Sequence, residues 1–81
     1  MLLNKEISKI FNEIAELLEI KGDSSFRINA YRKAAKILGS LQTDISEIYK
    51  EKGIKGIREI RGIGDSTAKK IEEYVKKKRI K

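Results

Sequence analysis

Residues 57–71, IREIRGIGDSTAKKI, hold two glycines, Gly62 and Gly64, between segments whose apolar residues recur at helical spacing. Glycine tolerates backbone angles that other residues avoid, and the Gly-x-Gly sequence therefore predicts a tight turn. After the turn, Asp65 or Ser66 offers a side-chain oxygen that can cap the start of a second helix. The stretch thus predicts two short helices joined by a hairpin turn.

Outward from this turn, the rest of the chain shows the same helical periodicity and contains no proline. A first amphipathic helix is expected over about residues 3–20 and should end at Gly22. Its apolar stripe consists of Ile7, Ile10, Phe11, Ile14, Leu17 and Leu18.

A second helix is expected after Asp23-Ser24-Ser25, whose side chains suit a helix start. Its core-facing side should carry Phe26, Ala30, Ala34, Ile37 and Leu38. Thr43 or Asp44 should cap a third short helix, and residues 54–60 predict one or two helical turns. The sequence therefore predicts an all-α fold, a compact bundle of four to five short helices. We expect one domain over residues 1–81, ending in a helix-hairpin-helix at about residues 54–76.

Composition excludes several classes of function. The 81 residues include no cysteine and no histidine, which excludes disulfides, zinc fingers and histidine-based catalysis. No apolar run approaches the roughly 20 residues that span a bilayer, and the first six residues do not resemble a signal peptide. We therefore expect no membrane partner and an intracellular location, which in a prokaryote means the cytoplasm around the nucleoid.

The chain has a net charge of +7, and its basic and acidic residues are unevenly distributed along the sequence. Residues 1–23 hold three basic and five acidic side chains, whereas residues 61–81 hold eight basic and three acidic side chains. A basic carboxy-terminal half indicates a nucleic acid partner. The alternative is a lysine-rich surface that is only solvated.

The predicted hairpin has the groups that bind a phosphate. A turn without Cβ atoms lets a phosphate approach the backbone, and the following helix begins with unpaired N–H groups. Arg61 and Lys69 add positive charge nearby, while Ile60 and Ile63 should anchor the helices in the core. Such a site contacts phosphates and not base edges. The alternative is that the two glycines only end one helix and begin another.

Three blocks of the sequence carry a wider resemblance. They are residues 16–23, ELLEIKGD, residues 26–35, FRINAYRKAA, and residues 60–64, IRGIG, followed by AKKIEEY at 68–74. With these blocks the chain resembles the amino-terminal domain of family X DNA polymerases, the polymerase-beta-like enzymes, from about residue 4 to residue 80. Arg61 departs from the pattern, because the family usually has proline there.

The resemblance implies a function and residues that perform it. In that family this domain binds the 5′ phosphate at a DNA gap, and some members remove a 5′-deoxyribose phosphate through a Schiff base. The nucleophilic lysine corresponds to Lys70, the phosphate-binding base to Arg27 and a tyrosine to Tyr31. Further DNA-contacting positions correspond to Lys33, Arg58 and Ser66, the last with loss of a charge.

The resemblance also implies a cation. The family's hairpin can hold Na⁺ or K⁺ on main-chain carbonyl groups, which correspond to those of Arg58, Ile60 and Ile63. No other cofactor is required by the sequence.

Lys70 is the most specific of these assignments. A free lysine has a pKa of about 10.4, so a Schiff-base lysine must be helped to lose its proton. We expect Lys70 at the edge of the apolar stripe, near Tyr74. Lys69 stands where active lyases often carry an acid, so that Glu72 or water would have to take up the proton in the elimination. The alternative is an ordinary surface lysine.

The leading prediction is non-sequence-specific DNA binding at gaps and 5′-phosphate ends. The partners would be gapped or 5′-phosphorylated duplex, single strands, and a polymerase catalytic region in the same or another chain. An active 5′-deoxyribose-phosphate lyase and a protein-interaction adaptor are the alternatives. No polymerase activity is expected, because no carboxylate cluster suited to catalytic metal ions is evident. Phe26 is expected in the core, with base stacking as the alternative.

Overall fold

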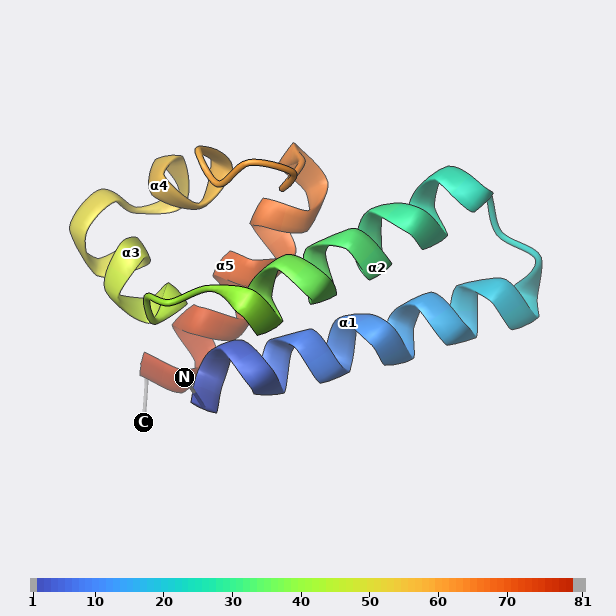
Figure 1. Cartoon of the computed structure of the whole chain (residues 1–81), viewed down its shortest axis with the longest axis horizontal. Coiled ribbons are helices and arrows are strands. Elements are labelled where there is room, and N and C mark those ends of the chain that lie inside the picture. The colour runs from blue at the N-terminus through green and yellow to red at the C-terminus, as the bar shows by residue number, and fades with distance from the viewer. Residues whose placement is uncertain (1, 80–81) are drawn as a thin grey trace.

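A computed structural model describes residues 2–79 as a bundle of five helices (Figure 1). In chain order these are α1 (Leu2–Lys21), α2 (Ser25–Ser40), α3 (Ile45–Lys52), α4 (Ile54–Arg58) and α5 (Asp65–Arg79). No residue in this range belongs to a strand. The predicted all-α class and the predicted number of helices are therefore confirmed.

α1 and α2 run side by side in opposite directions and form the longest part of the molecule (Figure 1). Gly22 ends α1 with a φ of 75°, a conformation that glycine adopts without strain. The N–H of Asp23 donates to the carbonyl of Leu18 at 2.9 Å, and the N–H of Gly22 to that of Glu19 at 3.1 Å. These two bonds form a Schellman motif, which turns the chain into α2.

The predicted core face of α1 is largely correct. Ile7 and Phe11 are fully buried, but Leu17, which we expected in the same stripe, is 57% exposed. Asn4 is buried instead, because its side chain joins α1 to the start of α3. Its amide donates to the carbonyl of Thr43 at 2.9 Å, and its Oδ1 accepts from the N–H of Ile45 at 2.8 Å.

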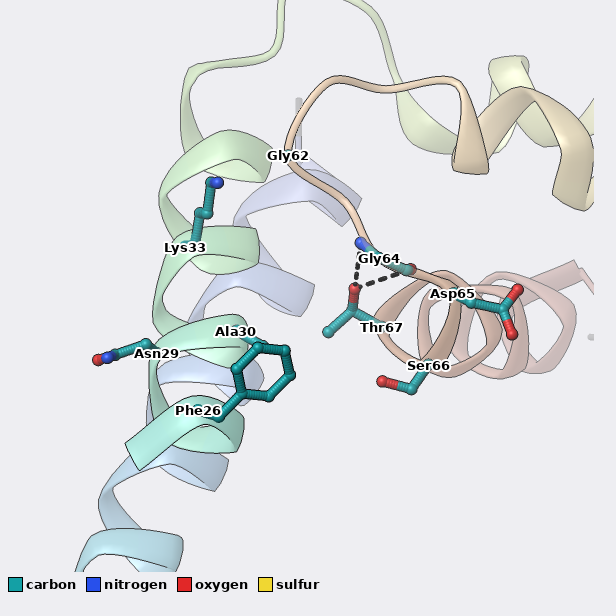
Figure 2. A pocket seen from close by; sticks show the side chains of 9 residues that line it. All are labelled: Phe26, Asn29, Ala30, Lys33, Gly62, Gly64, Asp65, Ser66 and Thr67. Atoms are coloured by element: carbon teal, nitrogen blue, oxygen red, sulfur yellow. Dashed lines mark hydrogen bonds between the residues drawn. The ribbon is translucent and has the colours of Figure 1, made fainter. Parts of the chain in front are cut away.

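α2 is rotated relative to the prediction. Its buried residues are Ile28, Tyr31, Ala34, Ala35 and Leu38. Tyr31 turns toward α1, where its ring packs edge-on against Phe11 with the ring centroids 5.2 Å apart. Phe26 is consequently 82% exposed, and its predicted place in the core is wrong. The side of α2 that carries Phe26 and Ala30 faces the hairpin between α4 and α5 (Figure 2).

The three short connections after α2 bring α3, α4 and α5 together at one end of the helical pair (Figure 1). Asp44 caps α3, as one of the two predicted alternatives, by accepting from the N–H of Ser46 at 2.8 Å. The hydroxyl of Tyr49 on α3 donates to the Glu72 carboxylate on α5 at 2.9 Å. None of the helices in residues 2–79 is both long and apolar enough to cross a membrane.

Candidate nucleic-acid interface

The hairpin between α4 and α5 is held against α2 at Gly62. This residue has a φ of 93°, and a Cβ atom on it would lie 2.6 Å from Cδ1 of Ile37 and 3.1 Å from Cε of Lys33. Ile63 is buried beside it and anchors the turn in the core, as predicted. The glycine at position 62 therefore permits the close contact that fixes the hairpin on α2. A Cβ at this position would point toward α2.

Gly64 begins α5 without a side-chain cap. Its carbonyl accepts from the N–H of Ala68 at 2.9 Å, which makes Gly64 the N-cap residue. The Thr67 hydroxyl lies 3.1 Å from both the N–H and the carbonyl of Gly64 (Figure 2). The prediction that Asp65 or Ser66 caps this helix is wrong, because both lie inside its first turn.

The first N–H groups of α5 remain available. Within residues 2–79, no hydrogen bond occupies the backbone N–H of Asp65, Ser66 or Thr67. Unpaired N–H groups at a helix start, together with the helix dipole, attract an anion. The starts of α2 and α3, in contrast, have side-chain caps: the Ser24 hydroxyl accepts from the N–H of Arg27, and the Asp44 carboxylate accepts from the N–H of Ser46.

A groove of about 440 Å³ lies between α2 and the start of α5 (Figure 2). Phe26 and Lys33 extend from α2 toward the hairpin, and Ser66 and Thr67 form the opposite side. The complete lining is Phe26, Asn29, Ala30, Lys33, Gly62, Gly64, Asp65, Ser66 and Thr67. The groove thus joins an open helix start, one cation and an exposed aromatic ring.

The predicted cations of this surface fall into two groups. In the described part of the chain, Lys33 and Arg61 form no ion pair with an acidic side chain. Arg58 and Lys69, in contrast, share Asp65: Nε of Arg58 lies 2.7 Å and Nζ of Lys69 lies 3.6 Å from its carboxylate oxygens. Lys33 is therefore the cation that lines the groove and is free to meet a phosphate.

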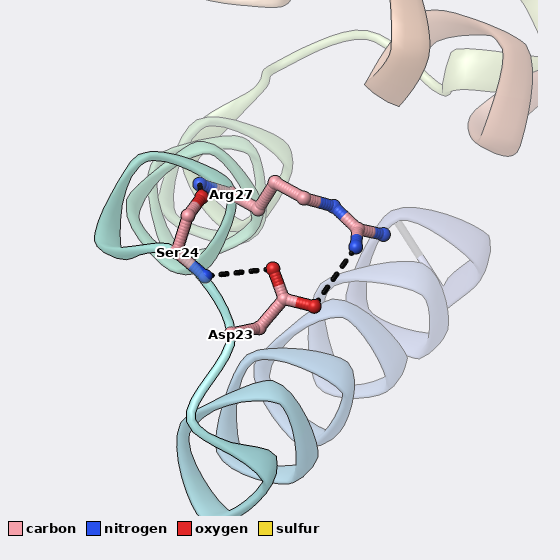
Figure 3. Close-up of polar contacts among 3 residues, drawn as sticks. All are labelled: Asp23, Ser24 and Arg27. Carbon is pink, nitrogen blue, oxygen red and sulfur yellow. Dashed lines mark hydrogen bonds and ion pairs between the residues drawn. The ribbon is translucent and has the colours of Figure 1, made fainter.

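Arg27 and Tyr31 do not line the groove. The guanidinium of Arg27 pairs with Asp23 at 3.0 Å, while the other oxygen of Asp23 accepts from the N–H of Ser24 (Figure 3). Arg27 is exposed at the first turn of α2, next to the α1–α2 loop. Tyr31 is a core residue with its ring against Phe11.

Lys70 lies outside the lining of the groove, on the following turn of α5. Its side chain is 37% exposed, which agrees with the expected place at the edge of the apolar stripe. Its Nζ lies 3.9 Å from the Glu73 carboxylate. Glu72, the acid that we considered as a proton acceptor, instead accepts a hydrogen bond from Tyr49.

The three main-chain carbonyl groups that the resemblance assigns to a cation are largely free of hydrogen bonds. Within the described residues, the carbonyl oxygens of Arg58 and Ile63 accept no hydrogen bond, and that of Ile60 accepts one, from Ile63 at 3.1 Å. Each oxygen therefore keeps a lone pair for a hard cation, which prefers oxygen ligands. No group of three acidic side chains that could hold a metal ion occurs in residues 2–79.

Sequence reasoning missed three residues of the groove, Asn29, Ala30 and Thr67, and offered Phe26 only through the alternative of base stacking. A detectable signal was the row Phe26, Ala30 and Lys33, because positions i, i+4 and i+7 share one helical face. A second was Thr67, three residues after Gly64, where a side chain can bond back to the N-cap amide.

Comparison with known proteins agrees with this geometry. Residues 3–80 match the helix-hairpin-helix domain family. The chain belongs to that family. It is also 34% identical over 71 residues to the DNA polymerase/3′-5′ exonuclease PolX of Bacillus subtilis (strain 168). The match covers 88% of this chain but only 11% of that protein. No solved structure matches the chain significantly.

These findings confirm the predicted resemblance to the amino-terminal region of a family X DNA polymerase. Both the helix-hairpin-helix match and the polymerase relative support DNA binding by this chain.

Proposed function

We propose that this domain binds the sugar-phosphate backbone of DNA, without sequence preference, at gaps and 5′-phosphorylated ends. The observation that carries the proposal is the open start of α5, which faces Lys33 and an exposed Phe26 across one groove. The helix-hairpin-helix family and the polymerase relative support DNA as the ligand.

The phosphate would bind at the start of α5. The amides of Ser66 and Thr67 have no acceptor within the described chain and can donate to phosphate oxygens, with Lys33 adding charge. Gly64 leaves this approach open, since a Cβ on it would have no atom closer than the Thr67 hydroxyl at 4.0 Å. Contacts of this kind involve no base edge, and affinity should therefore not depend on sequence.

Phe26 supports a preference for gaps over intact duplex. A ring that is 82% exposed at the rim of a phosphate site can stack on a base, which contributes about 1–3 kcal/mol in single-strand binders. In an intact duplex each base is already stacked on its neighbours. A gap or a strand end offers an unstacked base next to a phosphate, and so allows both contacts together.

Binding to matched DNA molecules tests the proposal. We expect affinity to rise from intact duplex, to the same duplex with a one-nucleotide gap and a 5′ hydroxyl, to the gap with a 5′ phosphate. Affinity should fall steeply with salt, by about 0.9 in the log–log slope for each phosphate contacted. Equal affinity for all three molecules would contradict gap recognition, and absence of salt dependence would contradict backbone binding.

Two exposed apolar residues provide a matched pair of variants. Phe26 and Ile20 are both 82% exposed, but only Phe26 lines the groove. Phe26→Ala should lose most of the preference for gapped over intact duplex, whereas Ile20→Ala should keep it. If the two variants behave alike, Phe26 does not stack on the DNA.

A second candidate function is 5′-deoxyribose-phosphate lyase activity at Lys70. The partly buried side chain of Lys70, at the edge of the apolar stripe, supports it together with the correspondence of Lys70 to the family's nucleophilic lysine. Borohydride should then trap a covalent adduct with a 5′-deoxyribose-phosphate substrate, and Lys70→Ala should abolish the adduct while retaining most DNA affinity. No adduct in the parent protein would contradict lyase activity and leave the DNA-binding proposal unaffected.

The proposal includes a monovalent cation at the hairpin. Na⁺ or K⁺ on the carbonyl groups of Arg58, Ile60 and Ile63 would add a positive charge at the hairpin and favour binding of a phosphate there. Replacing Na⁺ or K⁺ by tetramethylammonium at equal ionic strength should then lower both the thermal stability and the DNA affinity.

The proposal also includes a protein partner. Because the relative is a polymerase of which this chain spans about a tenth, a polymerase catalytic region is the partner that we expect.

A further inference from the structure

Asp65 is an acidic residue at the hairpin that pairs with two basic side chains. It lies in the first turn of α5, and its carboxylate points away from Phe26 (Figure 2). One oxygen pairs with Nε of Arg58 at 2.7 Å and the other with Nζ of Lys69 at 3.6 Å. A single carboxylate thus engages two of the cations that flank the proposed phosphate site.

The chemistry of this carboxylate is close to that of a phosphate. Both are anions whose oxygens accept hydrogen bonds from arginine and lysine, and both are favoured at a helix start. A DNA phosphate that approaches the amides of Ser66 and Thr67 meets a negative charge at the neighbouring residue. It also meets Arg58 and Lys69 with part of their donor capacity already used.

We propose that Asp65 is a built-in competitor of the DNA phosphate, which weakens the grip of the hairpin by engaging Arg58 and Lys69 in the free protein. The inference rests on the proposed function. It assigns a role to the acidic side chain at the centre of a basic hairpin. Such a domain would release DNA readily, because Arg58 and Lys69 can pair with Asp65 again when the DNA phosphate leaves.

The test is the variant Asp65→Asn on a gapped, 5′-phosphorylated duplex. Removal of one charge next to a bound phosphate should tighten binding by about threefold to tenfold at low salt. Each cation that is freed to contact a phosphate should also steepen the log–log salt slope by about 0.9. Asp65→Ser, a second neutral replacement suited to a helix start, should act in the same direction.

Glu19→Gln is the matched control. Glu19 is 60% exposed and pairs with Arg32 at 2.8 Å, much as the 62% exposed Asp65 pairs with Arg58. It changes the net charge by the same amount but lies on α1, so its effect on affinity and salt slope should be small. Thermal unfolding of each variant shows whether the fold is retained.

The outcomes separate this inference from the proposed function. If Asp65→Asn and Asp65→Ser bind no better than Glu19→Gln, only net charge matters and the competitor role is wrong. If they bind more weakly than the parent, Asp65 orients Arg58 for the phosphate and the inference is equally overturned. In both cases the parent still binds gapped DNA, whereas a parent that fails to bind it would overturn the proposed function itself.

Discussion

The starts of α3 and α5 differ in whether their first backbone N–H groups have hydrogen-bond acceptors. At α3, the first N–H groups all have acceptors: Ile45 donates to the Asn4 side chain, Ser46 to the Asp44 side chain and Glu47 to the Asp44 carbonyl. At α5, a glycine stands at the N-cap, and within the described chain no acceptor reaches the first three N–H groups. A helix that only needs stability satisfies these groups internally, whereas one that binds an anion leaves them free.

The start of α2 lies between these two cases. The Ser24 hydroxyl accepts from the N–H of Arg27 at 3.2 Å, and Asp23 holds the Arg27 side chain nearby. This start has a side-chain cap, and neither Ser24 nor Arg27 lines the groove. α4 also begins at a glycine, Gly53, without a side-chain cap, but it has only five residues and its start does not line the groove. An open start therefore marks the proposed binding site only where it also lines the groove, as at α5.

The largest effect is expected at Gly62, which sets the position of the open helix start. Gly62→Ala should destabilise the fold by about 2–4 kcal/mol, because a φ of 93° strains any other residue and the new Cβ would press on Ile37. Gly39→Ala is the control, since its Cβ would meet only the Ser8 hydroxyl at an ordinary 3.6 Å. Denaturant unfolding measures both. Equal stability of the two variants would show that the hairpin is not fixed on α2 by Gly62.

The second-largest effect is expected from a substitution that caps the open start of α5. Gly64→Asp should lower DNA affinity on the order of tenfold or more, because its carboxylate would cap the amides of Ser66 or Thr67 in place of a phosphate. The fold should be retained or slightly stabilised, since aspartate is a better N-cap than glycine. Gly64→Asn caps without adding charge and separates occupation of the amides from simple repulsion. Undiminished DNA binding by both variants would rule out α5 as the phosphate site.

The helices and the position of the hairpin turn could be predicted from the sequence. Helix spacing and glycine positions predicted all the helices, and Gly62-Ile63-Gly64 located the turn. The rotation of α2 could not be predicted, because Phe26 and Tyr31 are both aromatic and either could have faced α1. The contact between Tyr31 and Phe11 decides it, and that contact joins residues 20 positions apart.

The details of the site were also beyond the sequence. Asp65 and Ser66 have the side chains of cap residues, yet Gly64 takes the N-cap position because Thr67 bonds back to it. Arg58 and Lys69 were expected among the DNA-contacting residues, and their pairing with Asp65 was not foreseen. Such pairings depend on side-chain geometry across the turn, which residue types alone do not specify.

A moderate effect is expected at the cation that faces the open start. Lys33→Gln should weaken binding to gapped DNA by about threefold to tenfold, because it removes a charge beside the phosphate while retaining most of the side chain over Gly62. Lys36→Gln, one turn along the exposed side of α2, does not line the groove and should have a smaller effect. Titrations at several salt concentrations compare the two. If both lysines matter equally, DNA contacts a diffuse basic surface and not the groove.

The smallest effect is expected at the capped start of α2. Ser24→Ala removes the hydroxyl that accepts from the N–H of Arg27, and should destabilise the fold by about 0.5–1 kcal/mol. In a domain of this size that corresponds to a fall of roughly 2–8 °C in Tm. DNA affinity should stay the same once the protein is folded, because the proposed phosphate site lies at α5. The variant thus removes a cap where Gly64→Asp adds one. If Ser24→Ala instead strengthens DNA binding, the freed amides of α2 also attract phosphate, and an open helix start anywhere on this surface suffices.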